Sequence, residues 1–427
     1  MTRMVLHGGR LWDPEAAVER EGDVFLADGR IAAIGTAPDG FRPDREMDVT
    51  GCYILPGLVD LAARLREPGG GAKADIGSES LAAVAGGITT LVVPPDTQPP
   101  IDTGAVVEAI RKRAEAVGAA RVLCLGALTK GLAGEILAEM HALGRRGCVG
   151  VSNALSPIAD TEVLRRAMEY AATCGLTIHY HPEDPWLVSQ GFMHEGTVAT
   201  RLGIPAIPAV AETIALARAL LLVELTGARV HFCRLTCARS VELLAEAKAR
   251  DLPVTADVGI AYLYERDADV GFFDANHHVR PPFRSRADRD ALRAGLATGV
   301  IDAVCSDHQP HDSDAKTAVF SIAEPGCSLL DTFLPLLLGL REKAGLSGPA
   351  LARAAAFNPA RILGLDVGRL QPGAPADLCL VNPRAEWTLT AEVMKSRGKN
   401  SPYLGRTFRG RAVLTLIAGR EVFARKP

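Results

Sequence analysis

The chain has 427 residues, of which 48% are hydrophobic and 23% charged, a composition typical of soluble globular proteins. Its net charge of −3, with both signs interspersed, and its 5% aromatic content argue against a nucleic-acid face or a polybasic membrane surface. The length allows one large domain or two smaller ones.

Nine cysteines are scattered from Cys52 to Cys379 without a CxxC pair. We interpret them as buried free thiols in a reducing compartment. The closest pair, Cys233 and Cys237, lacks a second Cys/His pair at zinc-finger spacing and does not predict a finger. The N-terminal residues do not resemble a signal peptide, and no apolar run of about 18 residues occurs, so we expect a cytoplasmic protein.

The two ends of the chain carry similar short β patterns. Residues 24–35 (VFLADGRIAAIG) alternate around Asp28-Gly29, a type I′ hairpin signal, and residues 412–423 turn at Ala418-Gly419-Arg420. Hairpins of this size are marginal alone. We therefore expect the two ends to pack together as one composite β-sandwich.

Between the ends, short β-rich runs alternate with helical stretches rich in Ala, Leu, Glu and Arg. The predicted strands are 53–60, 88–94, 121–128, 148–153, 177–183, 229–235, 253–260 and 301–308. Eight strand-then-helix units indicate an α/β fold, a (β/α)₈ TIM-type barrel over residues 53–365, beside a small β-sandwich of residues 1–52 and 366–427. A doubly wound open sheet is the alternative, but the GxGxxG fingerprint that would favour it does not follow the first strand.

In such barrels the chemistry lies at the carboxyl ends of the strands, and polar residues gather there in this sequence. These residues are Asp60, Arg64, Asn153, His181, Glu183, Asp184, Arg234, Asp307, His308 and His311. Together they predict one site at that rim. His179 and His181 alternate along one strand, a spacing typical of metal ligands, although a lone interior histidine is more often structural.

Several long motifs in a fixed order carry a family resemblance. They are LREPG, GGITTLVVPPDTQPPID, HPED, GIPAIPAVAE, VHFCRLT, VRPPFRSRADRDAL and SDHQPH. The sequence resembles dihydroorotase of the amidohydrolase superfamily over nearly its whole length. The resemblance implies hydrolysis of the cyclic amide dihydroorotate, or ring closure of carbamoyl aspartate, with Zn²⁺ polarising the carbonyl and lowering the pKa of bound water.

Most zinc ligands that the resemblance implies are replaced here. The replaced positions hold Ala62, Arg64, Asn153, Ala154 and Arg234. At these positions the family that the sequence resembles has a His-x-His pair, an acidic pair after strand four and a histidine on strand six. Only His181 and Asp307 match, the latter being the family's catalytic proton shuttle. A guanidinium stays protonated and offers no lone pair to a cation, so we expect no metal and no cofactor.

Loss of a metal would leave Asp307 buried without a counter-charge, which is costly. We therefore predict that Arg64 or Arg234 pairs with Asp307.

The substrate-binding positions that the resemblance implies are half kept. Arg66 and His311 match the family, whereas Asp96 and Arg280 stand where the family has asparagines. Either Arg66 and His311 still bind an anion, or Arg66 pairs with Asp96 and the pocket is filled.

The resemblance extends to a non-catalytic dihydroorotase-like chain of some bacteria, which assembles with aspartate transcarbamoylase. We interpret this chain as such a pseudoenzyme of pyrimidine biosynthesis, in a homo- or hetero-oligomer, without nucleic-acid or membrane partners. One alternative is an active cyclic amidohydrolase with an atypical or single metal on His181 and Asp307. Another is a non-catalytic sensor of carbamoyl aspartate or dihydroorotate. We expect the loop 309–324 to be mobile or fixed in an inactive pose.

Overall fold

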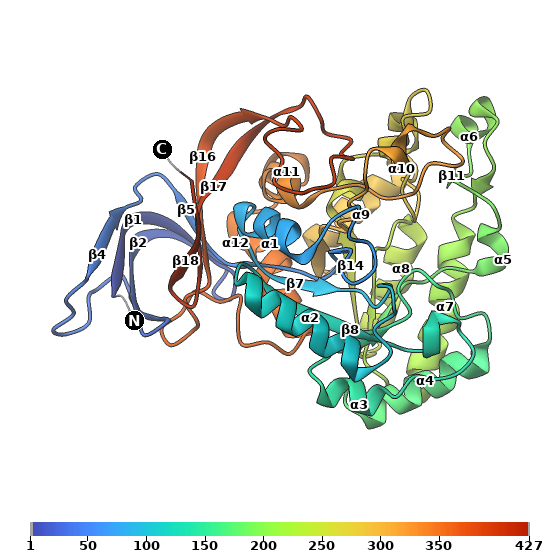
Figure 1. The fold of residues 1–427 in the computed structure, drawn as a ribbon, viewed down its shortest axis with the longest axis horizontal. Coiled ribbons are helices and arrows are strands. Elements are labelled where there is room, and N and C mark those ends of the chain that lie inside the picture. The colour runs from blue at the N-terminus through green and yellow to red at the C-terminus, as the bar shows by residue number, and fades with distance from the viewer. Residues whose placement is uncertain (1–2, 426–427) are drawn as a thin grey trace.

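The computed structural model describes residues 3–425 and divides into a barrel and a sheet built from both chain ends (Figure 1). The barrel strands form one parallel sheet in the order β15-β14-β13-β10-β9-β8-β7-β6. Their bounds are β6 Leu58–Asp60, β7 Ile88–Val93, β8 Arg121–Ala127, β9 Gly150–Ser152, β10 Ile178–Tyr180, β13 Val230–Phe232, β14 Val254–Gly259 and β15 Ala303–Cys305. A parallel bridge between Ala63 and His308 links the outer strands beyond their ends, so the barrel is nearly closed. The predicted barrel is confirmed, and the open-sheet alternative is wrong.

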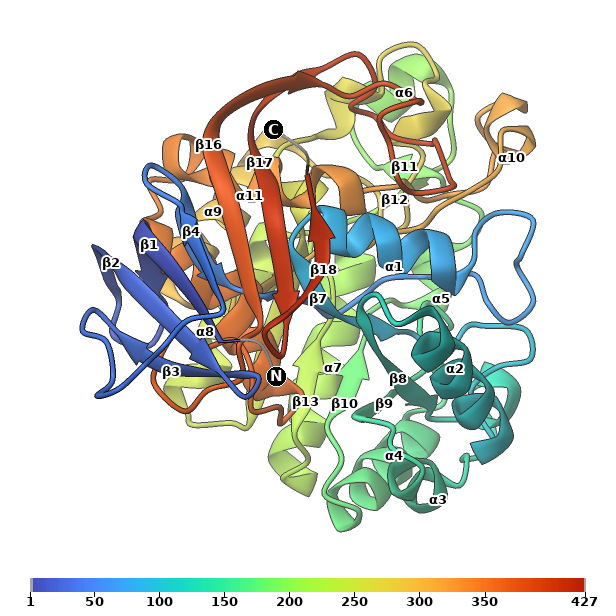
Figure 2. The same cartoon turned by 60° about the vertical axis from the view of Figure 1, so that its left-hand side comes forward.

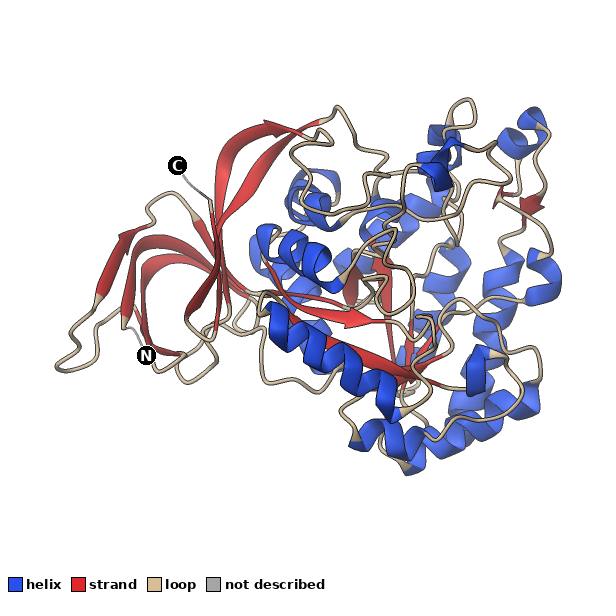
Figure 3. Cartoon of the chain, in the orientation of Figure 1, coloured by secondary structure: helices blue, strands red, loops and turns tan. Residues whose placement is uncertain are grey.

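Helices surround the barrel on its outside (Figure 3). The longer ones are α1 Ile76–Ala85, α2 Gly104–Val117, α3 Met140–Arg145, α4 Thr161–Thr173, α7 Val210–Thr226, α8 Ala238–Ala249, α9 Arg286–Thr298 and α11 Leu330–Lys343. Shorter elements are α5 Pro185–Val188, α6 Thr197–Leu202, α10 Asp314–Thr317, α12 Gly348–Ala352, α13 Asn358–Ile362, β11 Met193–His194 and β12 Ala206–Ile207. Helix α9 begins where sequence dictates, because Ser285 and Asp288 form a capping box. Within residues 3–425, no helix is both long and apolar enough to cross a membrane.

The two chain ends form a second sheet in the order β18-β17-β16-β5-β1-β2-β3, with β4 paired to β1. Its strands are β1 Met4–Asp13, β2 Val18–Ala27, β3 Arg30–Ile34, β4 Arg45–Asp48, β5 Tyr53–Pro56, β16 Leu378–Thr388, β17 Thr407–Ile417 and β18 Arg420–Ala424. Figure 2 shows β16, β17 and β18 side by side, with β1, β2 and β3 on the other limb. One apolar cluster contains residues from both limbs, including Leu26 and Leu414, so the sheet encloses its own core.

Both predicted hairpins are present. The first turns at Asp28 and Gly29, with φ of 51° and 76°, and the second at Ala418 and Gly419, with φ of 48° and 71°. Two successive positive φ values are what a type I′ turn requires.

The predicted strand 53–60 is divided at Gly57. Residues before it form β5 of the terminal sheet, and residues after it form β6, the first barrel strand. A Cβ at Gly57 would lie 2.4 Å from side-chain atoms of Thr89, so only glycine lets the chain pass here. Period-2 alternation is the same in both halves, which is why the pattern alone does not reveal the break.

Candidate functional site

Residues that follow the first and last barrel strands meet where the barrel closes. Arg64 lies just after β6 and Asp307 just after β15, and the backbone N–H of Arg64 donates to the carbonyl of His308 at 2.9 Å. Arg234, just after β13, reaches the same point. The predicted gathering at the carboxyl-end rim is therefore confirmed for these three charged residues.

Asp307 is shared by two buried arginines. Its Oδ1 accepts a hydrogen bond from Nη1 of Arg234 at 3.3 Å and lies 3.5 Å from Nη1 of Arg64. The exposed fractions are 3% for Arg234, 4% for Arg64 and 5% for Asp307, so water screens these charges little. Burial acts to lower the pKa of Arg234, but the negative groups around it, Asp307 first and Asp257 among the others, together outweigh burial and raise that pKa. The predicted pairing is confirmed, and both arginines take part.

Asp96 pairs with Arg64 rather than with Arg66. Nε of Arg64 donates to Oδ2 of Asp96 at 2.7 Å. Burial acts to raise the pKa of Asp96, but the charge and hydrogen bond of Arg64 outweigh it and lower that pKa. The predicted Arg66–Asp96 pair is wrong, because the chain turns at Arg66 (φ 61°) and its guanidinium reaches other partners.

Those partners of Arg66 are uncharged. Nε of Arg66 donates to the carbonyl of Pro310 at 3.0 Å, and its Nη2 lies 3.1 Å from Nε2 of His311. No carboxylate of residues 3–425 lies within 4.0 Å of this guanidinium. Burial, followed by repulsion from Arg64, lowers the pKa of Arg66 to about 10. Burial lowers the pKa of His311 to about 3, so that ring is neutral and does not add to the local charge.

A cavity of about 370 Å³ opens beside these arginines. The charged residues that line it are Arg64, Arg66, Lys73, Asp96 and Glu324. Lys73 pairs with Glu324, and Asp96 pairs with Arg64, so Arg66 is the lining cation without an acidic partner among the described residues. The cavity therefore carries an excess of positive charge.

His181, Glu183 and Arg280 form a second charged group at the rim. Nη2 of Arg280 donates to Oε2 of Glu183 at 2.9 Å, and Nε2 of His181 lies 3.6 Å from the same oxygen. Burial acts to raise the pKa of Glu183, but His181 and Arg280 together lower it to about 2. This pair was not predicted from the sequence, although an arginine at position 280, where the sequence resemblance implies asparagine, was a signal for it.

The positions of the family's acidic pair now have structural contacts. Nδ2 of Asn153 donates to the carbonyls of Leu132 and Ser156 at 3.2 and 2.9 Å, and its Oδ1 accepts from Thr129 at 2.8 Å. Its amide is therefore fully used in fixing the loop after β9. Ala154 and Ala62, both 5% exposed, offer only methyl groups.

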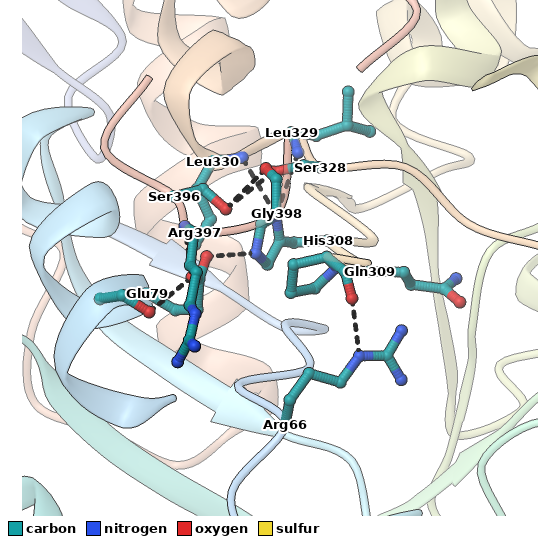
Figure 4. A network of polar contacts seen from close by, with 12 residues as sticks. Arg66, Glu79, His308, Gln309, Ser328, Leu329, Leu330, Ser396, Arg397 and Gly398 are labelled. Carbon is teal, nitrogen blue, oxygen red and sulfur yellow. Dashed lines mark hydrogen bonds and ion pairs between the residues drawn. The ribbon is translucent and has the colours of Figure 1, made fainter. Parts of the chain in front are cut away.

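His308 is held by a buried network rather than lying open at the rim (Figure 4). Its Nε2 lies 2.7 Å from Oε2 of Glu79, and its Nδ1 accepts from the N–H of Leu329 at 3.0 Å. The N–H of Arg397 donates to the other oxygen of Glu79 at 3.0 Å. The network ties α1 to the segments that cover the barrel mouth.

The loop 309–324 is attached to its neighbours by a half-buried lysine. Nζ of Lys316 donates to the carbonyls of Ala275 at 2.9 Å, His278 at 3.3 Å and Glu324 at 2.6 Å. Burial lowers the pKa of Lys316 to about 8. These contacts favour a fixed pose, and the mobility of the loop in solution stays a prediction.

Comparison with known proteins places these residues in a family. The chain is 46% identical over 414 residues to a "Dihydroorotase-like protein" of Pseudomonas aeruginosa, covering 97% of this chain and 98% of the relative. The chain belongs to the dihydroorotase-like family. The family's sequence model, "Dihydro-orotase-like", matches residues 51–240 of this dihydroorotase-like chain. It is also 41% identical to a "Dihydroorotase" of Geobacter sp. strain M21, covering 98% of this chain and 99% of that protein.

A solved structure shares the fold of this dihydroorotase-like chain. It is the "L-Hydantoinase (Dihydropyrimidinase) from Arthrobacter aurescens", with a TM-score of 0.88, 26% identity, and coverage of 99% of this chain and 96% of that one. The barrel with a sandwich of both chain ends is therefore the architecture of the amidohydrolase superfamily.

The rim residues of this dihydroorotase-like chain do not fit a zinc centre. Two guanidinium groups, at positions that the sequence resemblance assigns to metal ligands, contact Asp307 and would repel a cation there. The remaining candidates, His181 and Asp307, are fewer than the three protein ligands of a typical catalytic zinc site. The arrangement instead suits binding of an anion, because Arg66 lacks an acidic partner within residues 3–425.

Proposed function

We propose that this dihydroorotase-like chain is a catalytically degenerate pseudoenzyme that acts as a structural or regulatory partner of aspartate transcarbamoylase. The observation that carries the loss of catalysis is the buried Arg64–Asp307–Arg234 cluster. Asp307 cannot serve as a metal ligand and proton shuttle while two guanidinium groups hold its carboxylate. The fold is otherwise intact, with a continuous apolar core, which supports a role that depends on shape.

The catalytic part of the proposal is tested by turnover. Purified protein is assayed in both directions, with dihydroorotate and with carbamoyl aspartate, with and without added Zn²⁺. The Geobacter dihydroorotase serves as the positive control, and we expect no turnover above background. Turnover that increases with Zn²⁺ and is lost in His181→Ala would instead support the active cyclic amidohydrolase with an atypical metal site.

The partner is supported by the sequence resemblance to non-catalytic chains that assemble with aspartate transcarbamoylase. The test is co-expression with the aspartate transcarbamoylase of the same organism, with an affinity tag on one chain only. We expect a complex of fixed stoichiometry by size-exclusion chromatography with light scattering. Separate elution of both proteins at micromolar concentration would remove this part of the proposal.

A second candidate function is sensing of a pyrimidine precursor, favoured by Arg66, which has no acidic partner among residues 3–425 and lines a positively charged cavity. Carbamoyl aspartate or dihydroorotate should raise the thermal midpoint, because a ligand that binds only the folded state stabilises it. Arg66→Gln should abolish the increase, and the exposed control Arg145→Gln should keep it. An equal increase in both variants would refute binding at this cavity.

A further inference from the structure

Three buried side chains of types that can bind a metal lie together inside the barrel, away from the rim cluster. One ligand atom from each of His179, His231 and Cys233 lies within 4.8 Å of the other two. His179 on β10 and His231 on β13 are directly opposite in the parallel register, so their side chains project to the same side. Cys233 follows His231 by two positions, which places it on that side as well.

His179 lacks any hydrogen-bond partner in the part of the chain that the structure describes. It is 1% exposed, and neither Nδ1 nor Nε2 is satisfied. Buried polar groups are normally paired, so this ring is the kind of exception that points to a missing ion or ligand. The ring rests over Gly150, where a Cβ would lie 2.8 Å from its Cδ2, so glycine makes the space that the imidazole occupies.

His231 has one contact that metal-binding histidines usually have, a carboxylate on a ring nitrogen, and a second contact on its other nitrogen. Its Nε2 lies 3.0 Å from Oδ2 of Asp257, and its Nδ1 lies 2.9 Å from Oγ1 of Thr255. A carboxylate behind the imidazole fixes the ring orientation in many metal sites. One of these two contacts would give way when a ring nitrogen binds the metal.

We propose that His179, His231 and Cys233 bind a Zn²⁺ ion inside the barrel, independently of the rim positions. Imidazole nitrogen and thiolate sulfur are ligands that Zn²⁺ prefers. Binding forms two Zn–N bonds and one Zn–S bond, and the Cys233 thiol releases its proton to solvent. Zn–N bonds of about 2.0–2.1 Å and a Zn–S bond of about 2.3 Å require ligand atoms within a few ångströms of one another, as these three are. No hydrogen bond restrains the His179 ring, so it can turn toward the ion.

A cavity of about 470 Å³ lies at the opposite end of the barrel from the rim and is lined there by Thr177, Val230 and Thr255. Oγ1 of Thr255 also contacts the ring of His231, so one side chain separates this cavity from a proposed ligand.

The experiment is a titration of chelator-treated full-length protein with Co²⁺, followed by displacement with Zn²⁺. We expect one equivalent to bind, with a thiolate-to-Co²⁺ charge-transfer band that Zn²⁺ abolishes. Cys233→Ser should remove the band, and His179→Phe should weaken binding at least tenfold. The buried-thiol control Cys124→Ser and the rim variant His181→Gln should both keep the band.

Absence of the band in the wild-type protein overturns the inference, whether or not the variants fold. A band that survives in Cys233→Ser, or that is lost only in His181→Gln, also overturns it and places the metal elsewhere. Because the readout is the spectrum of the bound ion, it is separate from the turnover assay that tests the loss of catalysis.

Discussion

Replacing Asp307 by Asn tests whether the rim cluster is a structural ion pair. The variant removes the carboxylate that Arg64 and Arg234 share and keeps the side-chain size. Arg64 keeps Asp96 at 2.7 Å, whereas the side chain of Arg234 loses its carboxylate hydrogen bond. Breaking a buried pair from one side costs about 3–5 kcal/mol, because an uncompensated charge stays buried. Since Asp257 also helps to hold the charge of Arg234, we expect a loss near the lower end, about 3 kcal/mol.

The assay is urea denaturation at pH 7, with stability compared by midpoint and by the m-value. Asp39→Asn, which removes an exposed carboxylate, is the matched control. Adding Arg234→Gln to Asp307→Asn should recover part of the loss, because the unpaired charge is then removed. A loss within about 0.5 kcal/mol of the control, or no recovery in the double variant, would refute the reasoning.

Two further predictions test other parts of the fold. Folding lowers the pKa of Glu183 from 4.5 to about 2. Wild type should therefore be more stable than Glu183→Gln above pH 4.5, and this difference should disappear as the pH falls toward 2. A difference in stability that does not change with pH would contradict this prediction. The advantage should reach at most about 3 kcal/mol. Gly57→Ala should lower the free energy of unfolding by about 1–3 kcal/mol, because the added methyl group would clash with Thr89. The control Gly71→Ala has open space around it, so its free energy of unfolding in the same denaturation assay should stay close to that of wild type.

The barrel could be predicted from sequence because its signal is repeated. Each of the eight strands has its own apolar run followed by a helical stretch, so an error in one boundary does not change the architecture. The Asp307 contacts could also be predicted, because the carboxyl ends of the parallel strands meet at one rim whatever conformation the connecting loops adopt. Burial of a lone carboxylate then requires a cation, and Arg64 and Arg234 were the two arginines that the predicted strand ends placed at that rim.

The contacts that were missed depend on geometry that sequence spacing does not contain. Whether Arg64 or Arg66 reaches Asp96 is decided by the positive φ at Arg66, which no local pattern signals. The Glu79–His308 contact joins residues 229 positions apart through the packing of α1. The spacing of His179 and His181 suggested a metal, yet only the structure shows that His179 faces His231 rather than the rim.

The terminal sheet has a consequence for how the chain folds during synthesis. β5 pairs with β1 on one edge, but its other edge pairs with β16, about 320 residues later in the chain. At roughly 5–20 residues per second, a ribosome needs roughly 15–60 s to deliver that partner. Until then the nascent chain presents an open strand edge, which is a template for pairing with other chains. β16 therefore completes a sheet whose first strands were made long before it, and the barrel segments between them are synthesised while that sheet is still incomplete.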